Sequence, residues 1–339
     1  MAIAEGRTER RGGAGKLRTL LASLGLPLLA TIATLLGLEL ALRLADFREL
    51  REGNSERSLS YQHDAELGWA PIPNSTSIVT NARTIHVRHN SLGLRDQEFV
   101  PDGRPTIMFL GDSLVWGLDA EADERFSELL KPRLPDYRIV PAGVSGYGTD
   151  QEYLLLKRLW PTLKPAVVVL IFCTQNDRDD NATNIRYEGY HKPYFTIASD
   201  GELRGEGLPV PASRLQYIKE NWWVHHLWLA RLANAVYLKI RHPVIYVPDP
   251  TERLVDAMQD FVEMHGAKFM VGVQTTDLRL VHHLRLRGIP FATLDEADFY
   301  PGASVGGHWT PKGHEYVAAR LLALLEDNNA IRNQTHGAE

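Results

Sequence analysis

Four short segments carry side chains that could perform acyl chemistry. The first is Gly111-Asp112-Ser113, which ends the apolar run 106–110. The others are a glycine-rich stretch at 141–150, an asparagine-containing stretch at 173–181 and a histidine-containing stretch at 306–316. Ester transfer at a serine requires a hydroxyl that attacks, a histidine that takes its proton, and donors that hold the oxyanion. Together the four segments predict a serine-based acyl-transfer site.

These segments sit within a regular alternation of predicted strands and helices. Apolar runs predict strands at 106–110, 137–144, 166–173, 268–275 and 289–295. Helical spacing of apolar residues predicts helices at 125–134, 150–163, 252–265, 277–287 and 311–326. The alternation predicts an α/β domain with a parallel sheet covered by helices on both faces. In such sheets, sites form beyond the C-terminal ends of the strands, which is where the first three segments lie.

Block by block, the sequence resembles the SGNH (GDSL) hydrolase superfamily across residues 104–326. The matching stretches, in order, are "FLGDSLVWG", "AGVSGYGTDQ", "TQND" and "HWTPKGH". The resemblance implies a flavodoxin-like three-layer sandwich around a central parallel sheet, and it implies no cofactor. It further implies that Ser113 is the nucleophile and His308 the base. The implied oxyanion donors are the N–H groups of Ser113 and Gly146 and the side-chain amide of Asn176. No G-x-S-x-G elbow surrounds Ser113, which disfavours the α/β-hydrolase fold.

Each of these residues also has a structural alternative. Ser113 follows a predicted strand and could cap a helix. Gly146 could merely permit a turn, and Asn176 could cap the helix that follows it. His314 competes with His308 for the role of base. The family pattern favours His308, because the second histidine of such a pair sits at the start of a helix.

The sequence departs from the family pattern just before the expected base. Family members usually carry an aspartate two or three residues before the catalytic histidine, to orient the imidazole and stabilise its cation. Here those positions are Gly306 and Val305. Asp295 or Asp298 could reach in instead. Otherwise, a Ser–His dyad could operate, or activity could be weak or lost.

The N-terminal region predicts a membrane anchor. Residues 19–38 carry no charge and are about long enough to cross a bilayer. Five basic residues precede them: Arg7, Arg10, Arg11, Lys16 and Arg18. By the positive-inside rule, residues 1–18 are cytoplasmic, residues 19–44 form the anchor, and the rest lies outside the bacterial inner membrane, in the periplasm. The alternatives are a cleaved signal peptide, for which no clean cleavage site follows, and a buried core helix.

The remaining segments are assigned by composition. Residues 45–103 are expected to form a linker and an N-terminal extension on the main domain, and 327–339 a polar tail. The Trp-rich segment 221–240 is expected either to pack on the sheet or to line an acyl or glycan pocket. A net charge of −5 gives no sign of nucleic-acid binding. The single cysteine, Cys173, excludes an intrachain disulfide, and no metal-ligand spacing appears.

These observations predict a serine esterase or O-acyl(acetyl)transferase that works through a Ser113 acyl-enzyme. The expected substrate is an ester of a cell-envelope glycan or lipid, by analogy with anchored members of the superfamily. Hydrolysis and transfer share the acyl-enzyme and differ only in the acceptor. The alternative is a catalytically weak or inactive protein of this fold that binds glycans or assists assembly, favoured by the missing aspartate.

Overall fold

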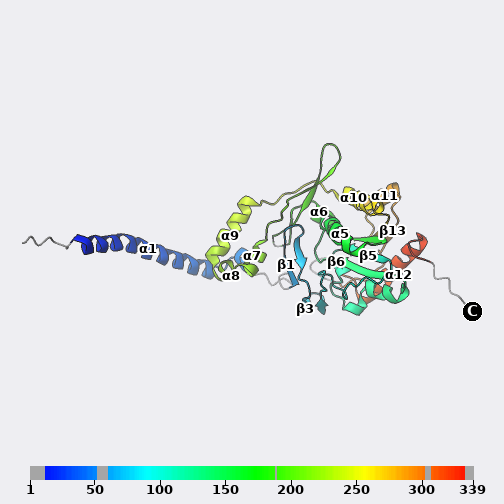
Figure 1. Ribbon diagram of the computed structural model, residues 1–339, viewed down its shortest axis with the longest axis horizontal. Coiled ribbons are helices and arrows are strands. Elements are labelled where there is room, and N and C mark those ends of the chain that lie inside the picture. Colours follow the sequence, from blue (N-terminus) through cyan, green and yellow to red (C-terminus); the bar gives the residue numbers. More distant parts are fainter. Residues whose placement is uncertain (1–11, 52–59, 188, 302–306, 333–339) are drawn as a thin grey trace, which may run out of the picture. The chain divides into compact units, whose positions relative to one another are not determined.

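The computed structural model describes residues 12–51, 60–187, 189–301 and 307–332 (Figure 1). The chain divides into two compact units. The first comprises Met1–Glu52 and Tyr217–Tyr237, and the second comprises Gly53–Gln216 and Leu238–Glu339. The sheet and all the predicted site residues belong to the second unit.

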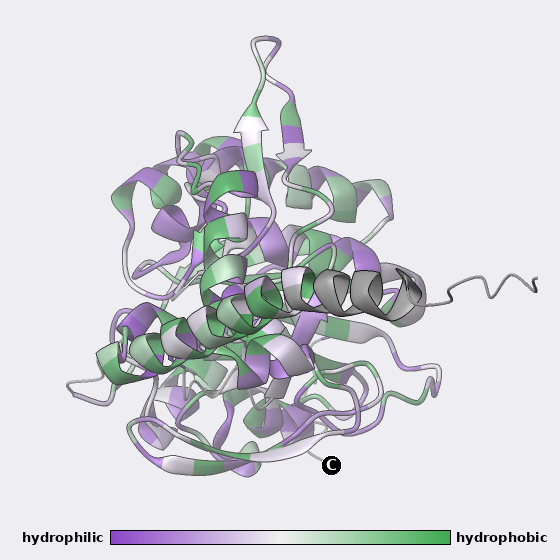
Figure 2. Ribbon diagram, turned by 90° about the vertical axis from the view of Figure 1, so that its left-hand side faces the viewer, coloured by the Kyte–Doolittle hydropathy of each residue, from purple (hydrophilic) through white to green (hydrophobic). Residues whose placement is uncertain are grey.

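The first unit is helical. It contains α1 (Gly12–Ala45), the short η1 (Arg48–Leu50), most of α7 (Arg214–Glu220), α8 (Trp222–His226) and most of α9 (Trp228–Arg241). Figure 2 colours much of the described part of α1 as hydrophobic. Within the described residues, Ser23–Ala45 is the one helical segment long and apolar enough to cross a membrane, and none of its most apolar window is buried. A buried core helix, one of the alternatives from the sequence, is therefore excluded.

The second unit is built on a parallel five-stranded sheet with the order β13-β12-β7-β5-β6. Its strands are β5 (Thr106–Gly111), β6 (Arg138–Gly143), β7 (Val167–Phe172), β12 (Lys268–Val273) and β13 (Phe291–Thr293). Numbered along the chain, this order is 2-1-3-4-5, which is that of the flavodoxin-like fold. Every residue of β5 and β7 is buried, as expected for strands covered on both faces.

Helices cover both faces of the sheet and so complete three layers. On one face, α5 (Thr149–Leu163) packs on β5 and α10 (Thr251–Met264) on β12. On the other, α4 (Phe126–Leu130) packs on β6 and α12 (Pro311–Asp327) on β13. The remaining helices are α3 (Ser113–Trp116), η2 (Ala122–Glu124), η3 (Lys131–Arg133), α6 (Asp177–Asn181) and α11 (Leu278–Arg287). The predicted α/β sandwich with a central parallel sheet is confirmed.

The segments outside the sheet form small antiparallel hairpins. Before β5, the second unit contains two such hairpins. In the first, β1 (Tyr61–Asp64) pairs with β2 (Gly68–Pro71), and in the second, β3 (Thr76–Thr80) pairs with β4 (Thr84–Arg88). The middle of the chain adds β8 (Ile185–Arg186) with β9 (Tyr190–His191), and β10 (Tyr194–Ile197) with β11 (Leu203–Glu206). Residues 217–237, which include most of the Trp-rich segment, group with α1 rather than with the sheet.

Candidate active site

Ser113 lies at the C-terminal edge of the sheet, where β5 passes directly into α3. Asp112 caps α3, because its Oδ1 accepts a hydrogen bond of 2.8 Å from the Leu114 N–H. The helix ends after one turn at Gly117, which has a left-handed backbone. Ser113 is the first residue of this helix and is half-buried. The buried strand thus ends in a turn that leaves one hydroxyl accessible.

His308 lies against that hydroxyl. Its Nε2 is 3.0 Å from Ser113 Oγ, although 195 residues separate the two in the chain. Asp112 Oδ2 is a more distant acceptor for the same hydroxyl, at 3.4 Å. The imidazole nitrogen is therefore the better-placed acceptor of the serine proton.

His314 faces elsewhere. Its Nδ1 accepts a hydrogen bond from the Phe126 N–H, and its ring stacks on the Phe126 ring. Burial, reinforced by the positive charges of Arg125 and Arg95, lowers the pKa of His314 to about 3. His314 is a neutral packing residue at the start of α12, and of the two candidate histidines only His308 contacts Ser113.

The carboxylate beside His308 is Asp119, which sequence reasoning missed. Asp119 Oδ2 lies 3.1 Å from His308 Nδ1, and the carboxylate is fully buried. With the proton on Nδ1, the Nδ1–H donates a hydrogen bond to Asp119, and Nε2 is left free to accept one from the Ser113 hydroxyl. The three side chains thus form a continuous hydrogen-bonded chain from carboxylate to hydroxyl.

The turn of the β3–β4 hairpin holds Asp119 in place. Asp119 accepts hydrogen bonds from Asn81 Nδ2 (2.7 Å), the Ala82 N–H (2.9 Å) and the Arg83 N–H (3.2 Å). Burial alone would raise the pKa of Asp119, but the hydrogen bonds from His308, Asn81 and Arg83 outweigh it and the pKa lies below its usual value. Its backbone is left-handed, with φ of 66°, a conformation that Asp tolerates better than most residues. Asp119 is therefore ionised and fixed from several directions.

Asp295 and Asp298, the acids expected from the sequence, do not contact His308. Both oxygens of Asp295 accept hydrogen bonds from Thr276, through its N–H and its hydroxyl. Asp298 Oδ2 accepts from the Thr310 hydroxyl at 2.7 Å. Their hydrogen bonds hold the two carboxylates to threonines and not to the imidazole. Val305 and Gly306, the positions of the missing aspartate, lie outside the described residues.

Gly146 lies in the loop between β6 and α5 and has φ of 83°. A Cβ built on it would lie 2.5 Å from both Cε2 and Oη of Tyr187, and the left-handed backbone itself favours glycine. Gly143, at the end of β6, is equally constrained, because its Cβ would lie 2.3 Å from the backbone nitrogen of Trp116. The close approach at Gly143 places the end of β6 against α3, and the one at Gly146 places the following loop against Tyr187.

The side chain of Asn176 already has partners. Its Nδ2 donates to Asp180 Oδ2 (2.8 Å) and Asp177 Oδ1 (3.2 Å), while its Oδ1 accepts from the Cys173 thiol (2.8 Å). Asp180 is in turn paired with Arg186 at 2.5 Å. Both amide hydrogens of Asn176 therefore point at carboxylates. Donating to a substrate oxygen would require the amide to exchange one of them.

A group of five buried carboxylates lies behind this edge of the sheet. Its members are Asp112, Asp150, Glu152, Asp177 and Asp180. Two cations accompany it: the buried Lys192 pairs with Asp150, and the half-buried Arg186 pairs with Asp180. Burial raises the pKa of Asp180 to about 7, even though the charge of Arg186 opposes the rise. Burial, with the charges of Asp177 and Asp112, raises the pKa of Glu152 well above its usual range.

Three potential ligand atoms within this region, from Asp112, Cys173 and Asp177, lie within 4.8 Å of one another. Each is engaged by the protein itself. Asp112 accepts from the Leu114 N–H, Asp177 accepts from the Cys173 N–H, and the thiol donates to Asn176. Burial raises the pKa of the thiol, which opposes the thiolate form that metals bind. The arrangement is that of an internal hydrogen-bonded network.

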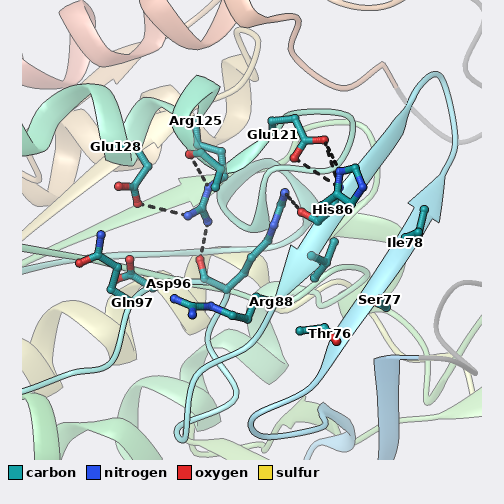
Figure 3. A pocket seen from close by; sticks show the side chains of 13 residues that line it. Thr76, Ser77, Ile78, His86, Arg88, Asp96, Gln97, Glu121, Arg125 and Glu128 are labelled. Atoms are coloured by element: carbon teal, nitrogen blue, oxygen red, sulfur yellow. Dashed lines mark hydrogen bonds and ion pairs between the residues drawn. The ribbon is translucent and has the colours of Figure 1, made fainter.

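A cavity of about 650 Å³ lies beside the β3–β4 hairpin (Figure 3). Thr76, Ser77 and Ile78 line it from β3, and Glu121 and Arg125 line it from the segment after Asp119. The close-up shows Glu121 bonded to His86 and Glu128 paired with Arg125. Its lining includes neither Ser113 nor His308. The cavity is a separate recess that shares only supporting segments with the candidate site.

Comparison with known proteins gives structural likenesses alone. The chain matches no protein-family model and no curated protein. A solved structure of TesA matches at 14% identity with a TM-score of 0.38, over 66% of this chain and 98% of the other. A GDSL-like lipase from Bacteroides thetaiotaomicron matches at 13% with a TM-score of 0.36, over 66% and 89%. The acetyl xylan esterase AlAXEase matches at 12% with a TM-score of 0.36, over 64% and 98%. The fold assignment above rests on the strand order rather than on these likenesses.

Proposed function

We propose that this chain is a serine esterase or O-acyl(acetyl)transferase of the SGNH type, with Ser113 as nucleophile and His308 as base. The observation that carries the proposal is the chain of contacts from Asp119 through His308 to Ser113, at 3.1 and 3.0 Å. Asp119 has the place of the orienting acid in this proposal, instead of Asp295 or Asp298. Nucleophile, base and acid in this geometry are the parts of a hydrolytic triad.

The reaction follows from the positions of the protons. Ser113 Oγ attacks the ester carbonyl while its proton passes to His308 Nε2. The imidazolium that forms is stabilised by Asp119, whose charge faces Nδ1. As the tetrahedral intermediate collapses, Nε2 returns the proton to the departing alcohol, and the acyl group remains on Oγ. Water or a sugar hydroxyl then attacks the acyl-enzyme with His308 again as base, which frees Ser113.

The oxyanion would be held by the N–H groups of Ser113 and Gly146 and by the amide of Asn176. Donors of this kind act because they are in place before charge develops. Since Asn176 donates to Asp180 and Asp177, its contribution requires the substrate oxygen to replace one carboxylate. Asp180 can give up the amide more readily than an ordinary carboxylate, because burial raises its pKa to about 7 and a protonated carboxyl is a weaker acceptor.

The proposed setting is the outer side of the bacterial inner membrane. The apolar helix Ser23–Ala45 follows five basic residues, the arrangement of a single-pass anchor with a cytoplasmic N-terminus. The substrate would then be an ester of a cell-envelope glycan or lipid. The non-catalytic alternative, a glycan-binding or assembly protein, depended on the lack of a carboxylate near His308. The position of Asp119 favours the enzyme.

The deciding experiment uses the full chain in detergent with a chromogenic acetyl ester. Ser113→Ala should lower turnover by about 10⁴-fold or more, since the loss of one member disables the whole unit. Ser127→Ala is the matched control, because the Ser127 hydroxyl is buried and has no hydrogen-bond partner among the described residues. A fluorophosphonate probe should label Ser113 and no other serine. If the wild-type chain neither turns over the ester nor takes the label, the non-catalytic alternative holds.

A further inference from the structure

Two adjacent tryptophans are exposed in the unit that contains α1. The Trp222 side chain is 60% exposed and that of Trp223 is 63% exposed, and the two rings contact each other edge to face. Further along the same segment, Leu232, Val236 and Tyr237 of α9 are also exposed, at 39%, 49% and 49%. Exposed aromatic and aliphatic side chains on two consecutive helices of one unit are typical of an interaction surface. We call these five residues, two from α8 and three from α9, the Trp222 surface.

Hydrogen bonds join this segment to the last turns of α1. The carboxylate of Glu39 accepts from the N–H groups of Trp228 (3.0 Å) and Leu229 (2.9 Å), and so caps the start of α9. Arg43, which is paired with Glu39 at 2.8 Å, donates to the His226 carbonyl at 2.7 Å. The backbone between α8 and α9 is therefore held at the level of Glu39 and Arg43 along α1.

That level coincides with a bilayer boundary if α1 spans the membrane as proposed. Residues 19–38 are uncharged, and at about 1.5 Å per residue they extend for roughly 30 Å, the thickness of a hydrocarbon core. Glu39 is the first charged residue after them. Its carboxylate and the backbone bonded to it therefore lie at the outer boundary. Tryptophan and tyrosine favour this boundary, because their rings are apolar and their N–H and O–H groups are polar.

We propose that the Trp222 surface inserts into the lipid of the outer leaflet, at the level of the headgroups and the first acyl carbons. The inference rests on the proposed membrane span and adds a second, interfacial contact to it. The contact would fix the unit in the membrane plane, since a single helix alone leaves it free to rotate and tilt. The ligand is a phospholipid surface, recognised by aromatic and aliphatic side chains.

The test uses fluorescence of the full chain in phosphatidylcholine–phosphatidylglycerol vesicles whose acyl chains carry bromine at carbons 6 and 7. Residues 19–44 contain no tryptophan, so the quenching reports on the soluble segments alone. Trp222→Phe/Trp223→Phe should remove roughly two thirds of the bromolipid-quenchable emission, because it removes two of the three tryptophans in 222–228. Trp160→Phe, in α5 of the other unit, is the control and should leave that emission unchanged.

Two other results would overturn the proposal. If the double variant and the wild type lose the same emission to bromolipid, the Trp222 surface does not contact lipid. If neither bromolipid nor iodide in the buffer quenches Trp222 and Trp223, another protein or a second copy covers the surface. Extraction with alkaline carbonate tests the span separately. A chain that is released by carbonate contradicts the anchor, whereas one that is retained without bromolipid quenching contradicts only the interfacial contact.

Discussion

Asp119 Oδ2 lies 3.1 Å from Nδ1 of His308, across 189 residues of sequence. The carboxylate follows Ser113 by only six positions, so hydroxyl and acid stand on one short segment and the histidine lies between them. The segment reverses direction through the left-handed residues Gly117 and Asp119. In the SGNH pattern, the acid is expected just before the histidine instead. The carboxylate beside His308 therefore comes from a different part of the chain than that pattern predicts.

The first prediction concerns that acid. Asp119→Asn should lower kcat for a chromogenic acetyl ester by about 10⁴-fold, the effect of the equivalent change in a serine-protease triad. Asparagine carries no charge to stabilise the imidazolium, and its amide can donate to Nδ1 and so favour the wrong tautomer. Steady-state kinetics on the full chain measure the loss, and circular dichroism checks that the fold is kept.

Asp295→Asn and Asp298→Asn are the matched controls for Asp119→Asn. Both acids bond to threonines away from His308, so each variant should retain turnover within roughly threefold. A severe loss in Asp298→Asn together with a mild one in Asp119→Asn would assign the acid to Asp298. Mild effects in all three variants would favour a Ser–His dyad.

Much of the fold follows from local pattern, and the structure shows why. The apolar runs at 106–110 and 166–173 are strands, since β5 and β7 are buried on both faces. Helices predicted at 150–163 and 311–326 differ by one residue at one end from α5 and α12. Periodicity is a property of neighbouring residues, so these strands and helices can be predicted without knowledge of the tertiary structure.

Asp119 could not be predicted in the same way. Its role depends on three donors from the β3–β4 turn, about 37 residues upstream. No spacing rule links that turn to His308. Glu152 is a second example, because it stands in a polar stretch at the start of α5 that resembles a solvated helix end. Its burial arises only when α5 and α6 pack beneath the sheet edge. A signal for Asp119 did exist, in its position just beyond the nucleophile block.

The second prediction concerns the turn that holds the acid. Asn81→Ala removes the 2.7 Å hydrogen bond to Asp119 Oδ2. We expect kcat to fall roughly ten- to a hundredfold with little change in KM, because a misplaced orienting group affects the transition state more than substrate binding. Thr80→Ala is the control from the same hairpin, since the Thr80 hydroxyl contacts Thr84 and not Asp119. If both variants reduce kcat alike, the effect belongs to the hairpin and not to Asn81.

The third prediction concerns Glu152, whose two carboxylate oxygens have no hydrogen-bond partner within the described residues. Burial raises its pKa, so the folded chain keeps a proton that the unfolded chain releases above about pH 4.5. Glu152 therefore contributes stability at low pH that is lost as pH rises. Glu152→Gln mimics the protonated acid and should make the free energy of unfolding fall less steeply with pH, by about 1.4 kcal/mol per pH unit.

The pH range of that measurement should be 6.5 to 8. Below it, the buried histidines interfere, because burial lowers the pKa of His89 and His191 to about 4 and makes stability rise with pH. Denaturant unfolding of the full chain at several pH values gives the slope. Glu315→Gln, at an exposed position on α12, is the control and should leave the slope as in the wild type. Equal slopes for wild type and Glu152→Gln would mean that Glu152 is ionised in the folded chain.

The last prediction concerns the orientation of α1 in the membrane. The five basic residues before position 19 should hold the N-terminus in the cytoplasm, so that the sheet unit lies on the other side. Alkaline phosphatase fused after Glu339 should be active, because its disulfides form only outside the cytoplasm. Replacing all five basic residues with glutamine should reduce that activity in a membrane-bound product of unchanged length.

A wild-type fusion that is inactive would reverse the orientation. A fusion that is active but shortened by cleavage after residue 38 would replace the anchor with a signal peptide. Such cleavage would leave Glu39 at the new N-terminus, so the carboxylate that caps α9 would stay in the mature chain.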